Sequence, residues 1–455
     1  MMSKTDSSRT YTMMTEAPVG PLIIRLAIPT IISMMITALY NMADTFFVSR
    51  LGTSASGAVG VIFSLMSIIQ AVGFTIGMGS GSLLSRSLGK KDYGAADTYA
   101  SSAFFFAFTT GCLLVVIGQV QLDRIVSHMG ATPTILPYAK DYARYIILGI
   151  PFIATSFVMN NQLRFQGMAA KAMIGLTAGG ILNMLLDPLF IFVLKLGIAG
   201  AAIATLISQC ASFCILLSFF LRRIPSTKLS IACISRKAGT YAAIIKNGLP
   251  SFARQGIASL AVIALNRQAG FYGDAAVAGM SITNRVFMFI MAIAIGIGQG
   301  FQPVCAMNYG AQKYVRVRQA FFFMVKLCAA IMSVCAVTCF VFAPQIVASF
   351  RNDPAVILVG AAAMRFQCLL LPFHSLIFGT NMMLQTTGQS NQATFTACLR
   401  QGIYFLPLII LLPRMFGLTG IELTQAIADC LTVLTSIPFA VWFLRSIAVQ
   451  HTGNG

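Results

Sequence analysis

The chain has 455 residues, of which 57% are hydrophobic and only 9% are charged, and its mean hydropathy is +0.82. Apolar runs near the length that crosses a bilayer, about 20 residues, recur from end to end. This pattern excludes an ordinary soluble domain and predicts a membrane protein, in which only helices or closed barrels satisfy the backbone. The runs do not alternate with polar residues, so helices are favoured over a barrel.

The formal net charge of +19 raises the question of nucleic-acid binding. The basic residues, however, stand singly or in small groups between apolar runs rather than along one face. That distribution favours the positive-inside bias of membrane proteins, and no nucleic-acid partner is expected. The cysteines lie mostly inside apolar runs and form no CxxC motif, which predicts neither a disulfide framework nor a zinc site.

Hydropathy predicts an all-α protein with about twelve membrane-spanning helices. In chain order they cover residues 22–48, 56–84, 96–119, 137–160, 170–194, 199–221, 241–266, 276–306, 319–342, 356–383, 393–413 and 420–445. The polar start of the chain has no cleavable signal pattern, so the first of these helices is expected to act as the insertion signal. With both termini in the cytoplasm, most Lys and Arg residues fall in inner loops, which predicts this orientation in the cell membrane.

The two halves of the sequence match at a single offset. Pro29 and Pro250 differ by 221 positions, and the same offset places the motif IGMG at 76–79 on IGQG at 297–300. Further pairs at this offset are Gly89 and Gly310, Tyr93 and Tyr314, Arg144 and Arg365, Pro151 and Pro372, Asn160 and Asn381, and Gly167 and Gly388. We therefore predict two pseudo-symmetric six-helix bundles with the same orientation, because six is an even number of spans.

The predicted domains are an N-terminal lobe (1–221), a basic cytoplasmic connector (222–240) and a C-terminal lobe (241–455). Two similar bundles of this kind favour a transporter over a channel or a membrane enzyme. The sequence also offers no nucleophile and base set, metal motif or phosphate loop, so neither an enzyme nor a cofactor is expected.

Three of the twelve acidic residues, Asp44, Asp187 and Asp429, fall inside predicted spans rather than in loops or at helix ends. A carboxylate in the membrane is expensive, so such a position indicates a function. At 1.5 Å per residue, Asp44 lies roughly 9 Å before Arg50 and Asp187 about 12 Å before Lys195. Both acids are therefore predicted in the outer-leaflet half of the first lobe.

Polar neighbours accompany these two acids. Tyr40 precedes Asp44 by four residues and Asn183 precedes Asp187 by four, so each lies on the same helix face as its acid. Such a pair can hold a proton, or a Na⁺ with further oxygen ligands. The offset of 221 places Leu265 and Leu408 at the positions of the two acids, so the second lobe keeps the fold without them. This comparison favours a coupling-ion role over a structural one.

The third acid, Asp429, is expected to pair with Arg285, because the two residues lie about nine positions into their helices from the outer side. This pairing predicts a structural role. His374 is expected to be a satisfied interior histidine rather than a proton relay, since no carboxylate lies within a helical turn.

Three segments carry a resemblance to a known family: AIPTIISMMITALYNMADTFFVSRLG, IGMGSGSLLSRSLGKKD, and NMLLDPLFIF followed by LGIAGAAIATLISQ. Together they resemble the MATE (multidrug and toxic compound extrusion) family over essentially the whole chain. The resemblance implies secondary antiport, in which toxic, often cationic and amphipathic compounds leave as Na⁺ or H⁺ enters. It also implies a cation site in the first lobe, made by Asp44, Asn183, Asp187 and Thr205, with Tyr40 and Asn160 close by.

The second lobe departs from some members of that family, which carry acids on the seventh, eighth or tenth helix. Here those helices offer Arg254 and Gln255, Arg285, and His374. The coupling site is therefore expected in the first lobe, and a carboxylate contact to a cationic drug in the second lobe is in doubt unless Asp429 provides it.

These observations predict a multidrug efflux antiporter that works as a monomer in the lipid bilayer on small amphipathic or cationic drugs, with H⁺ or Na⁺ as coupling ion. The alternative is a lipid or lipid-linked saccharide flippase of the same superfamily, whose cleft would carry several basic residues facing a diphosphate. The basic residues in or near the predicted spans are Arg25, Arg144, Arg254, Arg285, Lys326, Arg365 and Arg400.

Overall fold

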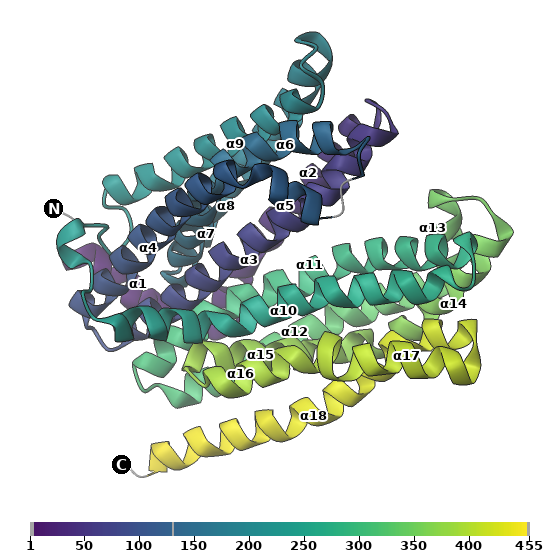
Figure 1. Cartoon of the computed structure of the whole chain (residues 1–455). Coiled ribbons are helices and arrows are strands. Elements are labelled where there is room, and N and C mark those ends of the chain that lie inside the picture. The colour runs from purple at the N-terminus through teal and green to yellow at the C-terminus, as the bar shows by residue number, and fades with distance from the viewer. Residues whose placement is uncertain (1–3, 130–131, 453–455) are drawn as a thin grey trace. The chain divides into compact units, whose positions relative to one another are not determined.

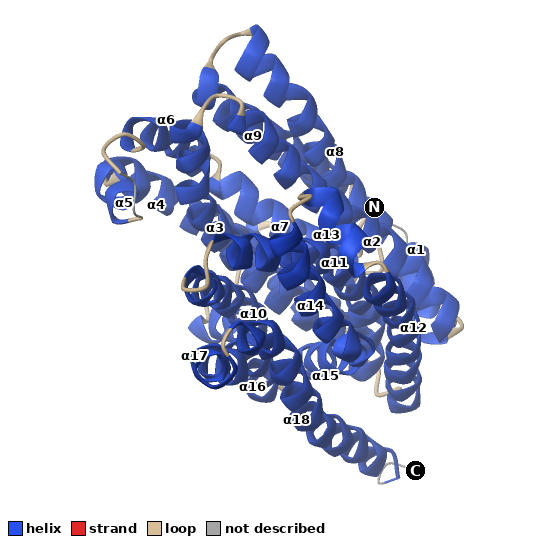
Figure 2. Cartoon of the chain, turned by 90° about the vertical axis from the view of Figure 1, so that its right-hand side faces the viewer, coloured by secondary structure: helices blue, strands red, loops and turns tan. Residues whose placement is uncertain are grey.

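The computed structural model describes residues 4–129 and 132–452, and within these ranges all regular structure is helical, with no strand (Figure 2). Eleven helices of this part of the chain are long and apolar enough to cross a membrane, or up to twelve if one bent pair counts as a single span. The bent pair is α6 (Leu136–Leu148) and α7 (Ile150–Phe165), which meet at 49° where Gly149 precedes the helix-starting Pro151. The predicted all-α membrane fold is thus confirmed.

The elements follow one another as coloured in Figure 1. Those of the first half, besides α6 and α7, are α1 (Lys4–Glu16), α2 (Val19–Ser49), α3 (Thr53–Gly89), α4 (Tyr93–Val120), α5 (Leu122–His128), α8 (Ala169–Pro188), the π-helix η1 (Leu189–Val193), α9 (Gly197–Leu221) and the 3₁₀ turn η2 (Ile231–Cys233). Those of the second half are α10 (Ala238–Gly270), α11 (Asp274–Gly310), α12 (Tyr314–Val341), α13 (Ala343–Phe350), α14 (Pro354–Leu370), the 3₁₀ turn η3 (Leu371–Phe373), α15 (His374–Thr387), α16 (Ser390–Cys398), the π-helix η4 (Leu399–Tyr404), α17 (Phe405–Phe416) and α18 (Leu418–Thr452).

The duplication is visible in the element boundaries. Shifting α3 and α4 by 221 residues gives the bounds of α11 and α12 at both ends. The turns repeat as well, because Lys91 and its equivalent Gln312 both adopt left-handed backbone, with φ of 62° and 58°. A similar backbone recurs at Gly167 and Gly388, with φ of 79° and 91°. The second half therefore repeats the first in its helices and in its turns.

The chain forms two compact units, which differ from the predicted lobes in two segments. Unit 1 comprises Met1–Glu16 and Ile32–Gly248, and unit 2 comprises Ala17–Ile31 and Leu249–Gly455. The start of α2 thus belongs to unit 2, while the connector and the start of α10 belong to unit 1. The predicted boundaries 1–221, 222–240 and 241–455 do not include these two segments in the same units as the structure does.

Glycines explain why the start of α10 belongs to unit 1. A Cβ atom on Gly79 of α3 would lie 1.9 Å from the carbonyl oxygen of Ile244, and one on Gly248 would lie 1.9 Å from that of Thr75. Only glycine allows two helix backbones to approach so closely. In unit 2, a Cβ atom on Gly300 of α11 would likewise lie 2.6 Å from the backbone nitrogen of Ala27 in α2.

The connector is fixed to α4 by hydrogen bonds rather than lying free between two lobes. The backbone nitrogen of Lys228 donates to Asp97 Oδ1 at 2.7 Å, and that of Ser235 donates to Ser102 Oγ at 2.9 Å. These bonds give the polar backbone of the connector partners within unit 1.

Helix packing within each unit sets the position of its polar residues. In unit 1, α7 packs against α3, α4 and α8, and α8 packs against α9. In unit 2, α11 packs against α12, α14 and α15, while α14, α15 and α17 pack against α18. Residues of α8 and α9 can therefore share a site in unit 1, and residues of α15, η4 and α18 can share one in unit 2.

Candidate functional site

The packing of α8 on α9 brings three of the predicted site residues together. The amide nitrogen Nδ2 of Asn183 donates to Asp187 Oδ1 and to Thr205 Oγ1, at 3.2 Å in both cases. All three side chains are buried, with exposed fractions of 3% for Asn183, 0% for Asp187 and 4% for Thr205. The first bond follows from the spacing of four residues along α8, whereas the second requires the neighbouring helix.

The outer part of α2 supplies the second carboxylate. The hydroxyl of Tyr142 in α6 donates to Asp44 Oδ2 at 3.4 Å. The negative charges of Asp44 and Asp187 interact electrostatically, and Tyr142 interacts with both. The two acids that the sequence placed at a similar depth are therefore close enough for their charges to interact.

Tyr40 joins the same group from one turn earlier on α2. A Cβ atom built on Gly180 of α8 would lie 3.3 Å from Tyr40 Cδ1. Gly180 precedes Asn183 by one helical turn, and Tyr40 also interacts electrostatically with Asp44. The small residue at position 180 thus lets the tyrosine ring of α2 pack directly on α8.

Several oxygens of this group have no hydrogen-bond donor within the described part of the chain. They are Asp44 Oδ1, Asp187 Oδ2 and Asn183 Oδ1, together with Ser208 Oγ one turn along α9 from Thr205. Buried polar atoms are normally paired, so these oxygens are suited to accept a ligand. Carboxylate, amide and hydroxyl oxygens are suited to a small hard cation or to a proton.

Asn160 lies elsewhere. Its Nδ2 donates to the carbonyl of Ala172 at 2.8 Å, and Ala172 stands eleven residues, roughly 16 Å along the helix, before Asn183. The equivalent Asn381 donates in the same way to the carbonyl of Ala393, at 2.7 Å. Both halves make this bond, although only the first half contains the acids Asp44 and Asp187. The bond therefore serves to join two helices. The structure does not bring Asn160 to the two carboxylates.

Tyr142 and Ser208 were not among the site residues predicted from the sequence. Tyr142 is completely buried although it lies near the outer end of its predicted span, and Ser208 follows Thr205 at helical spacing. A search for polar residues at the depth of the two acids would have found both. Their contact with the acids, however, depends on packing between helices.

In unit 2, Asp429 has other partners than expected. Its Oδ1 accepts hydrogen bonds from Arg400 Nε at 2.7 Å and from Gln425 Nε2 at 2.8 Å, and its Oδ2 lies 3.1 Å from His374 Nε2. The prediction of an Asp429–Arg285 pair is therefore wrong. His374 is a buried interior histidine with partners at both ring nitrogens, as expected: Nδ1 lies 3.1 Å from the carbonyl oxygen of Leu370, and α18 supplies the carboxylate across the helix interface.

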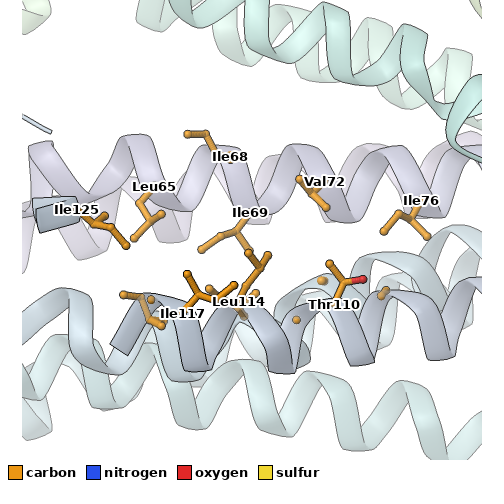
Figure 3. Close-up of a pocket in the computed structure, with 15 residues that line it drawn as sticks. Leu65, Ile68, Ile69, Val72, Ile76, Thr110, Leu114, Ile117 and Ile125 are labelled. Atoms are coloured by element: carbon orange, nitrogen blue, oxygen red, sulfur yellow. The ribbon is translucent and has the colours of Figure 1, made fainter. Parts of the chain in front are cut away.

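An apolar cavity of about 170 Å³ lies between α3, α4 and α7 in unit 1. Figure 3 shows Leu65, Ile69 and Val72 of α3 opposite Leu114 and Ile117 of α4. Its walls are almost entirely hydrocarbon, so this cavity offers no ligands for a cation. It is distinct from the group around Asp44 and Asp187, none of whose residues lines it.

A duplicated bundle of membrane-spanning helices is typical of transporters rather than of enzymes. The sequence matches the MatE family over residues 29–189 and 250–410, two segments separated by the same offset of 221. The chain belongs to the MatE family.

Individual relatives support this assignment over nearly the full length. The chain is 27% identical over 420 residues to multidrug export protein MepA of Staphylococcus saprophyticus, covering 92% of each protein. It is 26% identical over 440 residues to MepA of Staphylococcus aureus strain MRSA252, covering 96% and 97%. A solved outward-facing structure of a multidrug resistance MATE family transporter of the MOP superfamily superimposes with a TM-score of 0.91, 25% identity and coverage of 96% and 98%.

Proposed function

We propose that this protein is a multidrug efflux antiporter that exports amphipathic, often cationic compounds in exchange for H⁺ or Na⁺. The relatives known as multidrug export proteins support the export of drugs. The observation that supports coupling to a cation is the set of buried oxygens of Asp44, Asp187 and Asn183 that lack hydrogen-bond donors within the described residues. Tyr142 and Thr205 complete the group by hydrogen bonds.

Either coupling ion fits this chemistry. A proton on Asp187 or Asp44 removes one of two interacting negative charges and supplies a donor to an oxygen that lacks one. A Na⁺ ion instead takes oxygen ligands from both carboxylates, from Asn183 and from a hydroxyl. In both cases the bound positive charge reduces repulsion between the acid of α2 and the acid of α8, which favours an arrangement with the two helices drawn together.

Exchange requires that the cation and the drug compete for binding to the protein. Binding of either ligand must weaken binding of the other, and this antagonism is a coupling free energy between two sites. Helix α2 is suited to transmit it, because its end carries Asp44 in unit 1 while its start belongs to unit 2. A change at Asp44 therefore alters a helix that both compact units share.

We further propose that the protein resides in the cell membrane with both termini in the cytoplasm and functions as a monomer. The terminal residues 1–3 and 453–455 lie outside the described part of the chain. The proposed orientation rests on the excess of Lys and Arg in the loops predicted to face the cytoplasm.

The second candidate function is a lipid or lipid-linked saccharide flippase. It is favoured by one observation, that Arg254 and Arg400 line the same cavity of unit 2. A flippase would move a diphosphate-linked lipid and would show no drug-driven ion exchange.

The experiment that tests the main proposal is ethidium transport into everted vesicles, in which export from the cell becomes uptake, under an imposed pH gradient and, separately, under a Na⁺ gradient. Wild type is expected to export under one of the two, which identifies the ion. D44N and D187N are each expected to reduce export to the level of vesicles without the protein, because each removes a charged cation ligand. D141N serves as the control, since Asp141 is an exposed acid on the neighbouring helix α6.

Ethidium export by wild type under neither gradient would contradict the antiport proposal. Export by D44N or D187N at the wild-type rate, with normal membrane insertion, would show that the carboxylate is not needed for coupling.

A further inference from the structure

Unit 2 contains a cavity of about 210 Å³ whose surface is mostly apolar but whose lining includes several polar residues. The polar residues are Arg254 and Gln255 of α10, Asn381 of α15, Thr396 of α16, and Arg400 and Gln401 of η4. The apolar residues include Met291 of α11 and Phe378 of α15. The cavity is smaller than a typical pocket for a drug-sized molecule, so it suits one functional group with an apolar attachment.

The charge of this cavity is positive. Arg254 donates a hydrogen bond from Nη1 to Asn381 Oδ1 at 3.4 Å, and within the described ranges it forms no ion pair. Arg400 is paired with Asp429 at 2.7 Å, and that carboxylate also lies 3.1 Å from His374. The charge of Asp429 is therefore already compensated, while that of Arg254 is not.

Local backbone geometry places the second arginine at the cavity. Arg400 and Gln401 belong to η4, a π-helical segment that interrupts the span between α16 and α17. Such segments occur frequently at functional sites, because the wider turn redirects the side chains that follow. Here two successive residues, Arg400 and Gln401, both line the cavity.

The first half provides an internal comparison. At the offset of 221, Arg254 corresponds to Ser33 and Arg400 to Gly179, so the repeated fold does not need either arginine. The acids Asp44 and Asp187 correspond in turn to Leu265 and Leu408. The first half thus carries two acids and the second half two arginines, at different positions of the same repeated fold.

We propose that the cavity of unit 2 binds the anionic group, a carboxylate or a phosphate, of an amphipathic ligand. An uncompensated guanidinium inside a membrane protein is expensive, and intramembrane charges mark substrate pathways. The planar guanidinium fork matches the two oxygens of a carboxylate or phosphate, and Gln255 and Thr396 supply further polar contacts. Zwitterionic or anionic amphiphiles thereby join cations as substrates; this extension rests on the proposed export function, whereas the binding site itself does not.

Two dyes of matched shape test the proposal on the purified full-length protein. Rhodamine 110 carries a free carboxylate, and rhodamine 123 is its methyl ester and a cation. R254Q is expected to weaken rhodamine 110 binding by about tenfold or more while rhodamine 123 binding stays within about twofold, because only the carboxylate contacts the guanidinium. R254K, which keeps the charge without the fork, is expected to give an intermediate loss.

R285Q is the matched control, because Arg285 is an exposed arginine of a membrane-spanning helix that does not line the cavity. Wild-type binding of rhodamine 123 by R254Q shows that this variant is folded. Efflux of rhodamine 123 by R254Q measures export separately, so a failure of the anion site is distinguished from a failure of the antiporter proposal.

A second arm identifies the source of the anion. Phosphatidylglycerol retained by the protein in nanodiscs is quantified by native mass spectrometry for wild type and R254Q. Loss of rhodamine 110 binding alone assigns the cavity to a substrate carboxylate, and loss of retained lipid alone assigns it to a headgroup phosphate. Equal binding of rhodamine 110 and equal lipid retention by wild type and R254Q would overturn the proposal.

Discussion

Asp429 illustrates how a buried carboxylate is tolerated in unit 2. It is 1% exposed and contacts Arg400, Gln425 and His374. Replacing it by alanine would leave the half-buried guanidinium of Arg400 without its counter-charge and the buried imidazole of His374 without its partner. We expect D429A to lower the free energy of unfolding by about 3–5 kcal/mol, the usual loss when one partner of a buried ion pair is removed.

Thermal unfolding of the purified protein in detergent measures this loss. D274A is the control, because Asp274 is an exposed acid at the start of α11. Equal melting temperatures for D429A and D274A would show that the cluster does not stabilise unit 2.

Tyr142 provides a more specific test of the site in unit 1. Its hydroxyl donates to Asp44 Oδ2 at 3.4 Å, and the Y142F substitution removes that contact while keeping the ring in its buried position. We expect the apparent affinity for the driving ion to change by up to about tenfold, since a hydrogen bond to a charged group contributes about 1.5–3 kcal/mol and this one is long.

The measurement is drug efflux by Y142F against the concentration of the coupling ion, with Y138F, an exposed tyrosine of α6, as the control. If both variants followed the wild-type curve, the contact between Tyr142 and Asp44 would have no part in ion binding.

At the scale of elements, both π-helical segments stand beside the charged residues of their unit. The segment η1 begins two residues after Asp187, directly behind Pro188, which has no N–H to continue the α-helical ladder. The segment η4 contains Arg400 itself. Interruptions of the helix and charged side chains thus coincide in both halves, although they lie at different positions of the repeat.

The contact between α3 and α10 depends on glycine at two positions. A methyl group on Gly248 would lie 1.9 Å from the carbonyl oxygen of Thr75, so the helices must separate. We expect G248A to reduce stability by about 1–3 kcal/mol, as overpacking does. On the same helix, G239A is the matched control, because a methyl group on Gly239 would meet no atom within 4 Å.

The fraction of monodisperse protein on size-exclusion chromatography after heating compares the two variants. A G248A protein that survives heating as well as G239A would contradict the close backbone approach.

At the scale of the whole molecule, the charge distribution predicts the orientation. The inner loops are expected to hold most of the Lys and Arg residues, which remain on the cytoplasmic side. A green fluorescent protein fused to the C-terminus is therefore expected to fluoresce, while alkaline phosphatase fused there is expected to be inactive. An active phosphatase fusion would invert the proposed topology and place the Asp44 site in the inner leaflet.

The duplication was predictable because the two copies still share prolines and glycines at a constant offset. Proline and glycine are needed where a helix bends or two backbones approach, so Pro29 and Pro250 kept their offset in both copies. The acids were predictable for a related reason. A carboxylate within an apolar run is expensive and therefore rare, which drew attention to Asp44 and Asp187 before any contact was known.

The sequence by itself thus determined the helices, their repeat and the two acids of unit 1, because each follows from local composition and spacing. Only the tertiary structure decided which partners these residues have. Tyr142 stands 98 residues from Asp44, and Arg400 rather than Arg285 reaches Asp429. Such contacts depend on the rotation and packing of whole helices, which a one-dimensional pattern of hydropathy does not contain.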